Sequence, residues 1–144
     1  MASNSQGSLL GLYPQDGYAP NAANNSFVSM WCDKRSATHV SLSLTFYGSG
    51  TPDGYAQLQV SNAPENSNTT YGGGPLVLAG QTDPPDVIVI PNSAITITAT
   101  GAANGAHWEV DPSAHRWIRV QYVSTVSSAN LQAYCFVSVP FESP

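Results

Sequence analysis

Charged side chains are scarce in this chain of 144 residues. Asp and Glu number nine and Lys and Arg only four, which gives a net charge of −5. Together they make up 9% of the residues, against roughly 25% in typical soluble domains. Four cations are too few to form the basic clusters that bind phosphates or an anionic membrane surface. We therefore expect no nucleic-acid or membrane partner. A surface of neutral polar side chains favours contact with another protein, because fewer hydrated charges lose their water.

Long hydrophobic runs and cysteine clusters are also missing. The first residues, Met-Ala-Ser-Asn-Ser-Gln, have no basic segment followed by an apolar stretch, so no signal peptide is expected. No run approaches the roughly 18 apolar residues of a transmembrane helix. Two cysteines, Cys32 and Cys135, and three scattered histidines do not form a zinc-site pattern. Two free buried thiols are the simpler interpretation, and a disulfide between the first and last core strands is the alternative.

No arrangement of residues points to catalysis. The sequence contains no Gly-x-Ser-x-Gly motif and no glycine-rich phosphate loop. His39, His107 and His115 are far apart, and we interpret them as surface or turn residues. Most aspartates stand beside Pro or Gly in turns, where Asp bonds its own backbone. We therefore predict a protein that is not an enzyme and that has no cofactor and no metal site.

Two alternating segments give the clearest structural signal. Residues 40–46 read Val-Ser-Leu-Ser-Leu-Thr-Phe, and residues 56–60 read Ala-Gln-Leu-Gln-Val after a Gly- and Pro-rich turn. Successive side chains of a strand point to opposite faces, so the apolar half of each segment is predicted to be buried. We expect a hairpin whose buried residues are Val40, Leu42, Leu44, Phe46, Ala56, Leu58 and Val60. Its outward residues, Ser41, Ser43, Thr45, Gln57 and Gln59, form a candidate docking surface.

The remainder of the chain predicts an all-β domain. Further short β-branched or aromatic segments are separated by Gly, Pro, Asn and Asp, and no helical periodicity is sustained. The predicted strands cover 27–32, 40–47, 55–61, 76–79, 87–90, 94–100, 106–110, 116–123 and 131–139. Eight or nine short strands predict a two-sheet antiparallel sandwich, jelly-roll-like, over residues 27–144.

Residues 1–26 differ in character from the sandwich. Pro14, Gly17 and Pro20 interrupt regular structure, and large apolar residues are scattered between polar ones. We predict an extended N-terminal arm that lies either on its own domain or on a neighbouring molecule.

The segment 116–122 carries the strongest binding signal. By alternation Ile118, Val120 and Tyr122 face the core, which leaves Trp117 and Arg119 on the other face of the sheet. Aromatic residues and Arg are enriched at protein interfaces, and a Trp ring also stacks against sugars. The alternative is a Trp covered by a loop or by the arm. The long segment 61–74, in which Glu65 is the one charged residue, is a second candidate binding region.

Three segments together resemble small β-sandwich virion structural proteins of tailed bacteriophages. They are Gly-Thr-Pro-Asp-Gly at 50–54 leading into Leu-Gln-Val-Ser-Asn at 58–62, Arg-Trp-Ile-Arg-Val-Gln-Tyr at 116–122, and the closing strand 131–139. The resemblance implies a non-enzymatic capsid decoration (cement) protein that is made in the host cytoplasm and resides in the virion. Its implied partners are the major capsid protein and copies of itself, as a dimer or trimer about a symmetry axis.

The residues expected to contact these partners come from the arm and from segment 116–122. They are Leu9, Leu10, Leu12, Tyr13, Tyr18, Trp117 and Arg119. The alternative function is a carbohydrate-binding module of a phage tail fibre, or another component of the tail or neck.

Overall fold

The computed structural model describes residues 3–4, 7–10, 12–13, 26–34, 37, 39–66, 74–111, 114–125, 130–138 and 141–142. Strands dominate these residues, and the described part of the chain holds no α-helix, only the 3-10 turn η1 (Ala102–Asn104). The predicted all-β class is confirmed.

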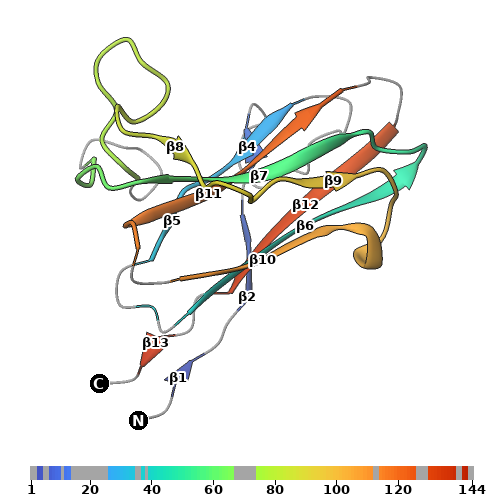
Figure 1. The fold of residues 1–144 in the computed structure, drawn as a ribbon, viewed down its shortest axis with the longest axis horizontal. Helices are drawn as coiled ribbons and strands as arrows, with labels where there is room; N and C mark the ends of the chain where they lie inside the picture. The colour runs from blue at the N-terminus through green and yellow to red at the C-terminus, as the bar shows by residue number, and fades with distance from the viewer. Residues whose placement is uncertain are drawn as a thin grey trace.

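The strands form two packed antiparallel sheets (Figure 1). The four-stranded sheet has the order β10 (Ala106–Val110), β6 (Val40–Ser49), β12 (Asn130–Ser138), β2 (Gly7–Leu10). The seven-stranded sheet has the order β3 (Leu12–Tyr13), β4 (Phe27–Ser29), β11 (Trp117–Ser124), β7 (Gly54–Ser61), β8 (Ile88–Val89). In that sheet β5 (Cys32–Asp33) also pairs with β11, and β9 (Ile95–Ile97) with β7. A separate pair joins β1 (Ser3–Asn4) to β13 (Phe141–Glu142).

The strand order is that of a jelly roll. The eight strand positions of this fold are filled in chain order by β2, β4 with β5, β6, β7, β8 with β9, β10, β11 and β12. The first position pairs with the eighth, the second with the seventh, the third with the sixth and the fourth with the fifth. This is the pattern of one long hairpin rolled into two sheets. It confirms the predicted two-sheet, jelly-roll-like sandwich.

The core lies between the sheets and contains the apolar residues of β6 and β7 that the sequence predicts to be buried. All seven residues predicted to face inward are buried. The ring of Phe46 on β6 meets Tyr122 on β11 at 4.9 Å between centroids and Phe27 on β4 at 6.3 Å. The aromatic cluster thus joins one sheet to the other.

The predicted hairpin between the two alternating segments is wrong. β6 pairs with β10 and β12, whereas β7 pairs with β11, β8 and β9 in the other sheet. Residues 50–53 therefore carry the chain from one sheet to the other, and the apolar faces of the two strands meet across the core. The alternation of apolar and polar residues predicts which face of a strand is buried. It does not predict the pairing partner, because a strand that forms a hairpin with its predecessor and a strand that crosses to the other sheet show the same alternation.

Two predicted strands differ from the structure in more than their bounds, whereas 87–90 and 94–100 are shortened to β8 and β9. Segment 27–32 is divided into β4 and β5, which pair with different parts of β11. Segment 76–79 is not a strand, because no neighbouring strand pairs with it. Its Leu78 is 52% exposed and accepts a turn hydrogen bond of 3.0 Å from the backbone N–H of Gln81. Gly80, between them, has a φ of 79°.

The N-terminal segment adds strands to both sheets of its own sandwich. β2 pairs with β12, with Leu9 opposite Phe136 and Leu10 opposite Cys135. β3 pairs with β4, and Leu12 is opposite Ser29. Two interpretations of the arm were open, contact with its own domain or with a neighbouring molecule. The strands β2 and β3 agree with contact with its own domain.

Candidate docking surface

The outer face of the four-stranded sheet carries a row of aromatic side chains, here called the aromatic strip: the exposed Tyr47 of β6, and the half-buried Tyr134 and exposed Phe136 of β12. Tyr47 is 46% exposed and Phe136 is 43% exposed. The Tyr47 and Tyr134 rings meet edge-on at 5.9 Å, and the Tyr134 and Phe136 rings are nearly parallel at 6.5 Å. A soluble monomer gains nothing by exposing such a contiguous row, and patches of this kind mark interaction sites.

The strip follows from alternation in two neighbouring strands. On β12 the residues Leu131, Ala133, Cys135 and Val137 are buried, which sends the residues between them outward. The register places Tyr134 opposite Thr45 and Phe136 opposite Ser43, so large rings stand beside small hydroxyl side chains. The Thr45 hydroxyl is buried in consequence, and it has no hydrogen-bond partner among the described residues.

Phe136 borders a shallow depression of about 110 Å³. The depression is lined by residues of three neighbouring strands, and its polar members are Ser41 and Ser43 of β6, His107 of β10 and Ser138 of β12. The strands β6 and β12 contain no charged residue, and Glu109 is the one charged residue of β10. An apolar row beside serine hydroxyl groups, on strands with no charged residue, suits a protein contact with little desolvation of charge.

The expectation that Trp117 and Arg119 are exposed is wrong. Both project away from the core, as alternation required, yet Trp117 is only 3% exposed and Arg119 only 5%. The indole N–H of Trp117 donates a 3.0 Å hydrogen bond to the carbonyl oxygen of Ala63. The loop that follows β7 therefore covers this Trp, which was the alternative interpretation from sequence.

Arg119 is held by groups from three segments. Its Nε donates to Gln59 Oε1 at 2.7 Å, and its second guanidinium nitrogen pairs with Asp83 at 2.7 Å. The guanidinium also lies 4.3 Å from the centre of the Trp31 ring. Burial lowers the pKa of Arg119, and the ion pair with Asp83 opposes that shift. These contacts fasten loops onto the outer face of the seven-stranded sheet, so Arg119 has a structural role.

The structure does not bring the predicted contact residues together on one surface. Leu9 and Leu10 lie in β2 at the edge of the four-stranded sheet, next to the strand that carries Phe136. Leu12 and Tyr13 lie in β3 on the other sheet, together with the strand of Trp117 and Arg119. Tyr18 lies outside the described residues. Sequence reasoning missed Tyr47, Tyr134 and Phe136, although one further step of the alternation in 40–46 would have placed Tyr47 outward.

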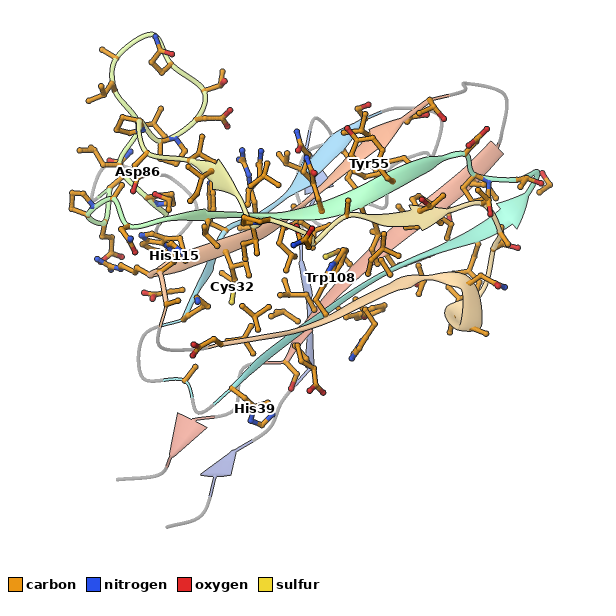
Figure 2. All side chains as sticks on the ribbon, viewed as in Figure 1. Cys32, His39, Tyr55, Asp86, Trp108 and His115 are labelled. Carbon is orange, nitrogen blue, oxygen red and sulfur yellow. The ribbon has the colours of Figure 1, made fainter. Side chains whose placement is uncertain are left out.

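The remaining candidate groups do not assemble into a reactive centre in the residues that the structure describes. No cluster of three or more His, Cys, Asp or Glu side chains there could hold a metal ion. His39 is exposed, and the Nδ1 of His115 lies 3.3 Å from the Asn62 side-chain amide. Both cysteines are free thiols, and Figure 2 shows Cys32 on β5. Within the same residues no helix has the length and apolar character needed to cross a membrane.

No protein-family model matches the chain, and no curated protein matches it.

Proposed function

We propose that this protein is a non-enzymatic structural protein of a bacteriophage virion, a capsid decoration protein that docks on the shell of the major capsid protein. The observation that carries the proposal is the aromatic strip on β6 and β12, two strands of the four-stranded sheet that contain no charged residue. Tyr and Phe supply large contact areas at low cost in side-chain entropy. The resemblance of segments 50–62 and 116–122 to phage virion proteins supplies the class of partner.

The fold is compatible with this role. Double-sheet jelly rolls occur in viral capsid domains and in lectins, a likeness at the level of the fold alone. A decoration protein need not bind tightly at one site, because a symmetric lattice and an oligomer about a two- or threefold axis multiply modest contacts by avidity. The strip and the β2 edge that adjoins it are the surfaces that we assign to contacts with the shell and with other copies of the chain.

The test measures binding of the full chain to purified shells of the phage that encodes it, assembled without this protein. Saturable cosedimentation with the shells is expected. Tyr47→Ser and Phe136→Ser should each weaken binding by about tenfold, since truncation of an aromatic anchor costs on the order of 1–2 kcal/mol. Leu78→Ser is the matched control, because Leu78 has a similar exposed fraction but lies in a turn outside the strip. Its binding should equal that of the wild type.

Substitutions test the surface better than deletion of residues 1–26 does. That deletion removes β2 and β3, which pair with β12 and β4 inside the sandwich. Loss of shell binding after deletion would therefore report damage to two sheets as well as loss of a contact. Shells that fail to bind the wild-type chain would overturn the proposal.

A second candidate is glycan binding by a tail-fibre module. Trp108 and Trp117 are both buried, so neither can stack on a sugar. The nearly parallel rings of Tyr134 and Phe136, with hydroxyl and amide groups beside them, offer the platform instead. Glycan-array hits that disappear with Phe136→Ser, together with no binding to shells, would establish this function and exclude shell docking.

A further inference from the structure

An apolar strand forms one edge of the seven-stranded sheet. β8 pairs with β7, and in the described part of the chain no strand pairs with its other side (Figure 1). Ile88 is 53% exposed and Val89 is 39% exposed. Soluble proteins usually protect such an edge with charged side chains, because an open edge can pair with a strand of another chain. β8 has no charged residue, so its edge is open to pairing.

The backbone of Val89 points toward the open side of β8. The backbone N–H of Ile90 donates a 2.9 Å hydrogen bond to the carbonyl oxygen of Leu58 on β7. In an antiparallel pair, hydrogen-bonded positions alternate with positions whose N–H and C=O point away from the neighbouring strand. Val89 precedes Ile90 and is opposite Gln59, so it is at a position of the second kind. Its N–H and C=O therefore point to the side on which a further strand can pair.

The exposed side chains of β8 lie on both faces of the sheet. Ile88 is opposite Val60, which belongs to the core, and so it is on the inner face. Together with Ile90 it lines a cleft of about 370 Å³ whose other wall is β10. Val89 is on the outer face, because successive side chains of a strand alternate. A strand laid along β8 would therefore gain apolar contacts on both faces in addition to backbone hydrogen bonds.

The charges around β8 permit pairing with a second copy of this chain. Segment 87–92 reads Val-Ile-Val-Ile-Pro-Asn and contains no charged residue. Asp86 precedes it, and its carboxylate accepts hydrogen bonds from the Ser61 hydroxyl at 2.6 Å and the Asn62 N–H at 2.8 Å. In two β8 strands paired antiparallel, the two Asp86 side chains lie at opposite ends of the paired segment. Because the chain has a net charge of −5, copies associate best where no two carboxylates meet.

We propose that two copies of this chain associate through β8, in an antiparallel pair centred on Val89 of each copy. The Val89 N–H of each copy donates to the Val89 carbonyl oxygen of the other, and Ile88 of one copy lies beside Ile90 of the other. A second copy fits this edge because a twofold axis brings the same free backbone groups and the same apolar side chains to both sides. The contact adds to those already assigned, since β8 shares no residue with the aromatic strip or with β2.

Sedimentation velocity of the full-length chain over a range of concentrations measures the association. The wild type should form a dimer as the concentration rises. Val89→Lys and Val89→Glu should each raise the dimer dissociation constant by about tenfold or more, because the twofold axis places like charges directly opposite each other. Leu78→Lys is the matched control, since Leu78 is also apolar and exposed but lies in a turn outside β8. Its dissociation constant should equal that of the wild type.

A mixture of the two Val89 variants tests the register. Lys in one copy is then opposite Glu in the other, so an equimolar mixture should form a heterodimer, although each variant alone remains largely monomeric. A wild type that is monomeric at every concentration overturns the proposal. An unchanged dissociation constant for Val89→Lys, or a mixture that stays monomeric, overturns it as well. No shell takes part in these measurements, so they are decided separately from shell docking.

Hydrogen exchange on the wild-type chain gives a measurement that needs no variant. The Val89 amide points away from β7, so it should exchange rapidly with solvent in the monomer and more slowly as the dimer forms, because it then donates to the second copy. The Ile90 amide is the internal reference, since it already donates to Leu58 within the monomer. Should either Val89 variant fail to fold, this measurement still decides. A Val89 amide that exchanges equally fast in monomer and dimer overturns the proposal.

Discussion

Truncation of Phe46 to alanine is expected to lower the free energy of unfolding by about 3–5 kcal/mol. The ring is fully buried at the centre of the sandwich and contacts the rings of Tyr122 and Phe27, which belong to the opposite sheet. The variant therefore loses the transfer energy of the ring, leaves a cavity between the sheets, and forfeits aromatic pair energies of about 0.5–1.5 kcal/mol each.

Phe136→Ala is the matched comparison. Phe136 stands on β12, beside β6 in the same sheet, but projects from the opposite face and is 43% exposed. Its truncation leaves no internal cavity, so the loss should be about 1 kcal/mol or less. The same chemical change thus separates a side chain that holds the sheets together from one that is free to contact a partner.

Urea denaturation followed by tryptophan fluorescence measures both losses. The midpoint should fall strongly for Phe46→Ala and slightly for Phe136→Ala, with the slope unchanged, because the surface exposed on unfolding stays nearly the same. Equal losses at the two positions, or a larger loss at Phe136, would refute the assignment of the inner and outer faces of the four-stranded sheet. The surface proposed for docking would then be part of a core.

Three further outcomes follow from individual contacts. Thr45→Val replaces a buried hydroxyl, which has no hydrogen-bond partner within the described segments, with a methyl group of similar shape. The free energy of unfolding should rise by about 1 kcal/mol, seen as a higher urea midpoint. Gly54→Ala would place a Cβ 2.3 Å from the Val123 carbonyl oxygen and should cost about 1–3 kcal/mol in the same assay. Burial raises the pKa of Cys32 from 9.0 to about 11 and that of Cys135 to about 12. Because the folded chain holds these protons more tightly than the unfolded chain, their contribution is complete below pH 9 and is lost as the pH rises toward 11–12. Urea midpoints that do not decline over that window, or thiols that react with a disulfide reagent at pH 8 as fast in the native state as in urea, would contradict this.

Several strands could be predicted because one face of each is buried. Segments 40–46 and 106–110 are strands in the structure, with their apolar residues inward. Segment 76–79 could not be judged from its composition, since a strand also needs a neighbour to satisfy its backbone. The carbonyl oxygen of Leu78 accepts a hydrogen bond from Gln81 within a turn, instead of one from a neighbouring strand.

The candidate site was harder to predict than the fold. Trp117 and Arg119 were placed on the correct face of their strand, but a loop and an acidic side chain distant in sequence cover them. Tyr134 and Phe136 could have belonged to either face, because small apolar residues, Ala133 and Cys135, alternate with them. Only the register of β12 against β6 decides that the small residues fill the core and the rings face outward.

By itself the sequence determined the all-β class, the inward halves of β6, β7 and β11, and a surface with little charge, because these depend on local alternation and composition. The tertiary structure alone decided that β6 and β7 lie in opposite sheets, that Trp117 is covered, and that Lys34 is buried. These features depend on which distant segments share an edge or a face, and backbone pairing and side-chain packing settle that only when the whole chain is folded. Two of the four cations are buried in structural contacts: Arg119 bonds to Gln59 and Asp83, and Lys34 to the backbone carbonyl oxygens of Asp111 and Ala114. The aromatic strip lies on β6 and β12, which contain no charged residue.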